Sequence, residues 1–150
     1  MSSYLFQINP VPASRPRVSK YGTYYLPTYK NFRNEMKELI AAGRKEAPYE
    51  LRTGPLKVLV ACVVKRPKTT ERTHPNGDVD NYAKAVLDSL NGVLWEDDDQ
   101  IVELEAMKMY AEADPFILVE ISDASDKPKK SRSKKGKVSK LCRQGKRSKR

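Results

Sequence analysis

Cysteine, histidine and long apolar runs are scarce in this sequence, and each shortage excludes a class of protein. Two cysteines, Cys62 and Cys142, and one histidine, His74, cannot supply the four ligands of a structural zinc site. An apolar run holds Cys62 whereas a basic segment holds Cys142, which argues against a disulfide. No apolar stretch approaches the roughly 20 residues of a membrane helix, and residues 1–9 lack a secretory signal pattern. We therefore expect a cytosolic protein that makes no membrane contact.

Acidic residues are missing from one end of the chain. Of the 29 lysines and arginines, 13 lie in residues 127–150, which contain no Asp or Glu. Residues 1–126 hold the other 16 against 19 acidic residues, a net charge of −3, although the whole chain carries +10. After residue 123 no apolar residue recurs at a regular spacing. We predict one folded domain at residues 1–123 and a disordered basic tail at 124–150.

The apolar spacing predicts an α+β fold in which two main helices pack on a mixed β-sheet. Thr28 is the expected N-cap of the first helix and Asp80 that of the second, which should stop at Gly92. The apolar run at 55–65 is expected in the centre of the sheet, and the last two strands are expected to pair antiparallel. The predicted elements are a strand at 4–8, a hairpin at 18–26, a helix from 28 to about 43–47, a strand at 55–65, a helix at 81–91 and strands at 101–110 and 115–122.

Two carboxylates stand two residues apart where the second helix is expected to begin. If Val79 points inward, Asp78 and Asp80 project to the same side, where they repel each other unless a cation binds. Mg²⁺ fits because it accepts one or two carboxylates and completes its shell with water and phosphate oxygens. A second acidic run, at 96–99, follows the same helix and can fold back beside the pair. Such a site can activate water and stabilise charge on a phosphodiester.

Lys84 lies one helical turn after Asp80, on the same helix face. Its ammonium group can pair with a carboxylate or hold the scissile phosphate, and Asp88 can anchor it from a further turn along. The alternatives are that Asp80 only caps a helix, that Lys84 is only solvated and that 96–99 is an ordinary exposed turn. An EF-hand is excluded, because the third oxygen ligand and the glycine of its loop are missing.

The longer pattern around these residues resembles the RusA family of Holliday junction resolvases, which is common in phages and prophages. The segment GDVDNYAKAVLDSLN at 77–91 is followed by WEDDDQI at 95–101. Together they match the arrangement D-x-D-N-x-x-K-x-x-x-D-x-L, a short gap and D-D-x-Q-[IV]. The proline- and arginine-rich loop at 10–17 and Lys108 are also similar to the family. The resemblance covers roughly residues 1–122.

The resemblance implies a homodimeric, Mg²⁺-dependent endodeoxyribonuclease, with Mn²⁺ as a substitute metal, that resolves four-way junctions by paired symmetric incisions. A two-fold dimer also suits the approximate two-fold symmetry of a four-way junction, since each subunit then makes one cut. Asp98 matches the third acid because it stands two residues before Gln100, although Asp97 or Asp99 can take its place. The implied site has the catalytic residues Asp78, Asp80, Lys84 and Asp98 and the metal ligands Asp78, Asp80 and Asp98, with Asp97 as a further metal ligand.

A domain of net charge −3 needs local basic patches to approach DNA. We expect one patch on the first loop and hairpin and a second on the loop before Asp78. The 13 positive charges of the tail should bind phosphates without sequence preference. The alternatives are ordinary surface charges for the patches and a solubility or localisation role for the tail. The candidate DNA-binding residues are Arg15, Arg17 and Lys20; Lys65, Arg66, Lys68 and Arg72; Lys108; and Lys134, Lys135 and Arg147.

The sequence thus predicts a structure-selective DNA endonuclease that acts on branched DNA in the cytosol of a bacterium or phage-infected cell. Two alternatives stay open. One is a non-catalytic DNA-binding or packaging accessory whose working part is the tail. The other is a metal-dependent nuclease that acts on flaps or replication forks.

Overall fold

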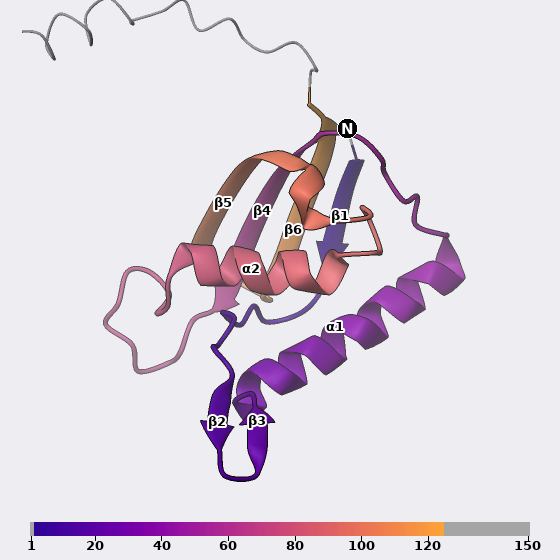
Figure 1. Ribbon diagram of the computed structural model, residues 1–150. Coiled ribbons are helices and arrows are strands. Elements are labelled where there is room, and N and C mark those ends of the chain that lie inside the picture. The colour runs from indigo at the N-terminus through magenta and orange to yellow at the C-terminus, as the bar shows by residue number, and fades with distance from the viewer. Residues whose placement is uncertain (1, 125–150) are drawn as a thin grey trace, which may run out of the picture.

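Four strands form one mixed β-sheet in the computed structural model, which describes residues 2–124 (Figure 1). Their order across the sheet is β1-β6-β4-β5, with bounds Ser2–Phe6 for β1, Leu56–Lys65 for β4, Ile101–Ala111 for β5 and Phe116–Asp123 for β6. The expected mixed sheet, with the 55–65 strand inside it, is confirmed. The predicted tail, with Lys134, Lys135 and Arg147, lies outside the described residues.

Both helices, α1 (Pro27–Glu46) and α2 (Val79–Leu90), pack on the same face of the sheet (Figure 1). Successive side chains of a strand point to opposite faces, so every second residue of β4 and β6 faces the helices. The expected α+β layering is therefore confirmed. The core between the layers contains Tyr29, Phe32, Met36 and Ile40 of α1, Tyr82, Ala85, Val86 and Leu90 of α2, and Val58, Val60, Cys62, Ile117, Val119 and Ile121 of the sheet.

The start of α1 differs from the expected one. The helix begins at Pro27 with Leu26 as its N-cap, so Thr28 lies inside the first turn and its prediction as N-cap is wrong. Proline suits the first helical position because its ring fixes φ and its missing N–H loses no helical bond. The end of the helix at Glu46 is confirmed within the expected range.

The start of α2 is also shifted. Asp78 is the N-cap, with an extended backbone, and Asp80 lies in the first turn, so the prediction of Asp80 as N-cap is wrong. Val79 is 38% exposed, so the inward orientation on which the same-side projection of the two carboxylates depended is not found. The expected stop at Gly92 is confirmed, because this residue has a φ of +76° that suits glycine directly after a helix.

The expected antiparallel pairing of the last two strands is wrong. β4 lies between them, pairing parallel with β5 on one side and antiparallel with β6 on the other. The reason is the strand–helix–strand unit β4-α2-β5, since a helical crossover between neighbouring strands makes them parallel. β6 then occupies the free side of β4, and β1 adds antiparallel to its other edge.

The opposite face of the sheet is not covered by either helix (Figure 1). A row of apolar side chains crosses all four strands there, because the register places Leu5 beside Leu118, Leu118 beside Ala61 and Ala61 beside Met107. Leu5 is 54% exposed. We call this row the open-face row.

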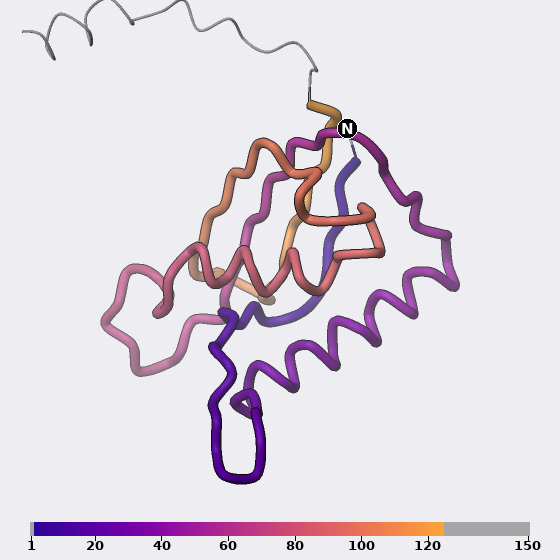
Figure 2. Tube along the Cα trace, in the orientation of Figure 1, coloured from indigo at the N-terminus to yellow at the C-terminus, as the bar shows by residue number. Residues whose placement is uncertain are grey.

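The predicted hairpin is confirmed as β2 (Arg17–Ser19) paired with β3 (Gly22–Tyr24). It extends away from the sheet beside the first turn of α1, as the trace in Figure 2 shows. Its exposed residues include Val18, Tyr21 and Tyr24. No helix of residues 2–124 is both long enough and apolar enough to cross a membrane.

Candidate active site

The loop before α2 fixes the position of Asp78. Gly77 has a φ of +97°, and a Cβ on it would lie 3.1 Å from Cγ of Pro12 and 3.3 Å from Cε2 of Tyr82. Glycine is therefore required both for the backbone conformation and for the close approach. On the other side, the backbone N–H of Ala13 donates a 2.9 Å hydrogen bond to the carbonyl oxygen of Asn81. The first loop is thereby joined to the start of α2.

Two side chains donate hydrogen bonds to carbonyl oxygens of this loop and so fix its path. The ammonium group of Lys108, in β5, donates hydrogen bonds to the carbonyl oxygens of Pro75, at 2.9 Å, and Gly77. The hydroxyl of Tyr82 donates a 2.7 Å bond to the carbonyl oxygen of Asn76. Lys108 thus positions the backbone immediately before Asp78. Its expected contact with DNA stays a prediction.

A hollow of about 560 Å³ opens beside Asp78. The first loop, the start of α1, the loop before α2 and Lys108 all contribute to its walls. Arg72, one of the predicted DNA-binding residues, lines it together with His74 and Asn81. The hydroxyl of Ser14, also in the wall, is buried and has no hydrogen-bond partner among the residues described.

The exposed side of α2 carries Asp80, Lys84 and Asp88, each one turn from the next, and we call this set the α2 row. Nζ of Lys84 lies 3.8 Å from Oδ2 of Asp88, which confirms the expected contact between them. The Lys84 side chain is nevertheless 66% exposed, so a single surface ion pair does not immobilise it. Its ammonium group remains accessible to a phosphate.

Asp98 differs from its acidic neighbours because a buried residue holds it. Nε1 of Trp95, a side chain with no exposed surface, donates a 2.8 Å hydrogen bond to Oδ1 of Asp98. Burial raises the pKa of the Asp98 carboxyl, the indole bond lowers it, the charges of Asp88 and Asp97 raise it and Lys84 lowers it. Asp98 therefore lies within electrostatic reach of Lys84 and Asp88, two members of the α2 row.

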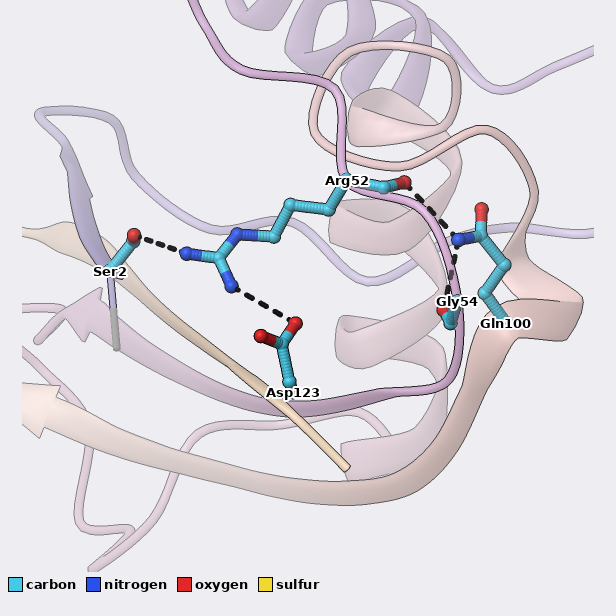
Figure 3. Close-up of polar contacts among 5 residues, drawn as sticks. All are labelled: Ser2, Arg52, Gly54, Gln100 and Asp123. Atoms are coloured by element: carbon cyan, nitrogen blue, oxygen red, sulfur yellow. Dashed lines mark hydrogen bonds and ion pairs between the residues drawn. The ribbon is translucent and has the colours of Figure 1, made fainter. Parts of the chain in front are cut away.

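Asp97 has a local structural task. Its carboxylate accepts a 3.3 Å hydrogen bond from the backbone N–H of Asp99 and caps the short 3₁₀ helix η1 (Asp98–Gln100). Oε1 of Gln100 accepts bonds from the backbone N–H groups of Glu96 and Asp97. The Gln100 amide also donates to the carbonyl oxygens of Arg52 and Gly54 (Figure 3). The acidic run is therefore an ordered turn.

Arg52 extends this anchorage to the edge of the sheet. Its guanidinium group donates a 2.6 Å hydrogen bond to Oγ of Ser2 in β1 and lies 3.5 Å from Oδ1 of Asp123 in β6 (Figure 3). The segment that receives Gln100 is thus tied to two strands. The rigid body of the sheet fixes the place of Asp98 through these contacts.

The fit of the acidic residues to a divalent metal depends on how closely their carboxylates gather. No three His, Cys, Asp or Glu side chains in residues 2–124 lie close enough to hold one ion together, so Asp78, Asp80 and Asp98 do not form a single three-ligand group. Mg²⁺ does not require such a group, because it takes one or two carboxylates and keeps several waters. Within the described part of the chain, neither Asp78 nor Asp80 forms an ion pair. These carboxylates fit a hard divalent cation.

The predicted DNA-binding residues of the two patches are solvent-exposed. Those of the first patch lie on the loop and hairpin before α1, and those of the second lie at the end of β4, in the case of Lys65, and on the loop between β4 and α2. Arg66 lies over the ring of Tyr110, 5.4 Å from its centroid, which orients its guanidinium group. The exposed residues are Arg15, Arg17 and Lys20 of the first patch and Lys65, Arg66, Lys68 and Arg72 of the second.

Sequence reasoning did not assign a role to Trp95 or Tyr82, which position Asp98 and the loop before Asp78. The signal for Trp95 was present, since it is the one tryptophan of the chain and stands three residues before Asp98. No sequence signal indicated that the Tyr82 hydroxyl would bond to Asn76. Such a contact depends on how the loop folds back over the helix.

Comparison with known proteins agrees with this geometry. A curated protein of Bacillus subtilis (strain 168), described as uncharacterized protein YqaN, is 30% identical over 133 residues, covering 77% of this chain and 92% of the relative. Residues 7–122 match the sequence model of the family described as Endodeoxyribonuclease RusA. This match spans both helices, strands β4 and β5, nearly all of β6 and every candidate site residue of the described domain. The chain therefore belongs to the RusA endodeoxyribonuclease family, whose members cut Holliday junctions in DNA.

Proposed function

We propose that the protein is a cytosolic, Mg²⁺-dependent resolvase that cuts four-way DNA junctions by paired symmetric incisions as a homodimer. The observation that carries the proposal is the placement of Asp98. A buried tryptophan holds this carboxyl within electrostatic reach of Lys84 and Asp88, directly after the helix whose N-cap is Asp78. Family membership supplies the class of reaction, and this arrangement supports the residues assigned to it.

In this proposal Asp78, Asp80 and Asp98 are the catalytic acids, and each Mg²⁺ would be held by one or two of them together with water, with Mn²⁺ as a substitute metal. Bound Mg²⁺ supplies a water of lowered pKa and neutralises charge on the phosphodiester. The state of Asp98 supports its role, since burial and two neighbouring carboxylates raise its pKa and a nearby cation would favour its charged form. Asp97 remains a further metal ligand only if its capping bond is given up.

Lys84 binds the scissile phosphate in this scheme. Its long side chain extends from the α2 row into solvent. Its contact with Asp88 is a weak surface ion pair, which a phosphate oxygen can replace. An ammonium group acts on phosphate as a mobile point charge, which suits a group that must follow the substrate during cleavage. Lys84 therefore sets the position of the phosphate relative to Asp80.

The open-face row supports the proposed dimer. Two copies related by a two-fold axis can bury the same apolar row against each other, which makes a self-complementary interface. Such a contact leaves both helices of each subunit facing outward, where they remain accessible to DNA. Two active sites on opposed sides of one particle match two cuts in opposed strands.

The proposal is tested by cleavage of a synthetic four-way junction with Mg²⁺. Asp80→Asn is expected to lower the cleavage rate at least about 100-fold while junction binding is kept, because the amide removes a negative oxygen ligand. Asp114→Asn, an exposed acid in the turn between β5 and β6, is the matched control and should cut like the wild type. Equal cleavage by wild type and Asp80→Asn contradicts the assignment.

A panel of substrates and metals tests the finer points. Four-way junctions should be cut faster than flaps, forks or linear duplex, and a preference for flaps or forks would make the enzyme a different structure-selective nuclease. Activity with Mg²⁺ and Mn²⁺, and its loss with chelator, are expected. Removal of residues 127–150 should weaken binding but leave cleavage at low salt, since the tail supplies only phosphate attraction.

A further inference from the structure

Four positive side chains form a line along α1 that no predicted patch includes. Lys30, Arg33, Lys37 and Arg44 recur at spacings of three, four and seven residues. At 3.6 residues per turn they fall within a sector of about 60° on one side of the helix. At the same helical spacing, the acidic residues of α1 fall outside this sector, on the other side of the helix. We call this line of cations the basic stripe.

The basic stripe has not been neutralised by the rest of the domain. None of its four members takes part in an ion pair within residues 2–124. Arg33 is instead held by aromatic rings, with its guanidinium carbon 5.6 Å from the Tyr25 ring centroid and 5.9 Å from that of Tyr29. Four positively charged side chains that form no ion pair within the described domain, whose net charge is negative, indicate that the stripe binds an anionic partner.

The stripe borders the candidate active site. Arg33, Lys37 and Arg44 line a hollow of about 330 Å³ whose other wall includes Asp88, the last member of the α2 row. At its other end the stripe meets the hairpin, where Lys30, Arg33 and Lys37 line a second hollow with Tyr24 and Tyr25. It therefore runs from the hairpin, along the gap between the helices, to a point beside the α2 row.

The dimensions of the stripe suit a nucleic-acid backbone. The 14 residue-to-residue steps from Lys30 to Arg44 span about 21 Å at a rise of about 1.5 Å per residue. One strand of a DNA duplex carries one phosphate per about 3.4 Å of duplex axis, so an arm that lies beside the stripe presents several phosphates over that length. A single small anion would leave most of the stripe unpaired, whereas a continuous backbone can contact all of it.

We propose that the basic stripe binds the phosphate backbone of one duplex arm of the junction and guides that arm away from the α2 row. The inference deepens the proposed function and rests on it for the identity of the DNA. The arm lies along α1, beyond the scissile phosphate, so the stripe contributes affinity and orientation rather than chemistry. Contacts to phosphate carry no sequence preference, so any arm sequence is accepted.

The test measures the affinity of the full chain for a four-way junction, in chelator, as a function of salt. Lys37→Gln removes one stripe cation, and Lys45→Gln is the matched control, an exposed lysine of the same helix outside the stripe. Loss of one phosphate contact lowers the slope of log affinity against log salt by about 0.9, which corresponds to roughly eightfold weaker binding at 0.1 M salt. Lys45→Gln should change binding less than about twofold.

Further variants exclude trivial explanations. The triple variant Lys30→Gln, Lys37→Gln and Arg44→Gln should lower the slope by about 2.7, with an unchanged circular dichroism spectrum because all three side chains are exposed. Lys37→Arg keeps the charge and should restore binding. Linear duplex should show the same losses as the junction, since the stripe contacts an arm and not the branch point.

Two results overturn the inference. One is an unchanged salt slope in the triple variant, and the other is an equal loss for Lys37→Gln and Lys45→Gln. Neither result depends on cleavage. If the wild type binds through the stripe but fails to cut the junction, the proposed catalytic function fails while this inference stands.

Discussion

The indole nitrogen of Trp95 and the carboxylate of Asp98 are joined by a 2.8 Å hydrogen bond that links the core to the candidate active site. The ring of Trp95 is wholly buried, whereas Asp98 is partly exposed. A side chain locked by packing has few alternative positions, so it holds its partner more firmly than a surface residue can. Because the two residues are only three apart in the sequence, the chain between them must form a tight turn for this bond to exist.

Trp95→Phe keeps an aromatic ring and removes this donor. The free energy of unfolding should fall by at least about 1.5–3 kcal/mol, the usual contribution of a hydrogen bond to a charged group, because the smaller ring also leaves a cavity in the core. The cleavage rate should fall about tenfold or more while junction affinity is kept, because Asp98 is no longer oriented. Urea unfolding and single-turnover cleavage measure the two effects. Tyr49→Phe, a similar loss of a polar group away from the site, should cut normally, and an unchanged rate in Trp95→Phe would remove Asp98 from the mechanism.

Gly77→Ala should harm both stability and cleavage. Alanine at a positive φ costs about 1–2 kcal/mol, and here its methyl group also meets Pro12 and Tyr82. Gly54→Ala is the matched control, with a φ of +79° and no atom within 4 Å of the added Cβ. The control should lose only the backbone contribution, measured by chemical unfolding. Similar losses in both variants would show that the contact with Pro12 and Tyr82 carries no strain.

Lys108→Met separates two roles for this residue. If Lys108 holds the carbonyl oxygens of Pro75 and Gly77, its removal should lower the cleavage rate and leave the salt slope of DNA binding unchanged. If it contacts a phosphate, the slope should instead fall by about 0.9. Lys65→Met, in an exposed predicted patch, is the comparison that should show the slope change. Binding titrations at several salt concentrations decide between the roles.

Leu5→Glu should convert the proposed dimer to a monomer. Leu5 lies in the open-face row and is 54% exposed, so a charge there disturbs the interface more than the fold. Leu104→Glu is the control, since Leu104 is 45% exposed on the edge strand β5 and pairs with the core residue Val58, which puts it on the face that bears the helices. Light scattering coupled to size exclusion gives the mass of each. A dimeric Leu5→Glu would place the interface elsewhere.

Burial raises the pKa of the Cys62 thiol to about 12, which predicts an unreactive cysteine. In the background of Cys142→Ser, a thiol reagent should label Cys62 at pH 8 only after unfolding, because the nucleophile is the thiolate. The unfolded state loses its thiol proton at lower pH than the folded state. Stability from this group is therefore present below about pH 9 and is lost as pH rises toward 12. Rapid labelling of the folded protein would contradict the burial.

The elements of the fold could be predicted from the sequence because each depends on local periodicity. The helix face with Phe32, Met36 and Ile40, and the apolar run of β4, are visible in any window of about ten residues. The pairing of the strands was harder to predict, because the short link between β5 and β6 suggested a hairpin. That link in fact crosses the end of β4. The crossover helix α2 contained the missing information, since it requires β5 to run parallel to β4.

The candidate site was predictable in its residues and less so in its geometry. Spacing alone placed Lys84 beside Asp88, because residues four apart on a helix are neighbours. The relation of Asp78 to Asp80 was expected from strand-like alternation, but Asp78 caps the helix and Asp80 lies within it. The anchoring of Asp98 by Trp95 depends on a turn whose path no periodicity describes. The helical spacing of the basic stripe is a signal in the sequence. The acidic and basic residues that lie between its members concealed this signal.

The sheet order β1-β6-β4-β5 has a consequence for the newly made chain. β4, α2 and β5 are contiguous in sequence and can assemble as soon as residue 111 has been synthesised. β1 is made first, yet its sheet neighbour is β6, which is made last. The N-terminal strand must therefore wait for residues 116–123, and until then the edge of β4 is open to wrong partners. The active-site elements thus form early, while the first and last strands close the domain together.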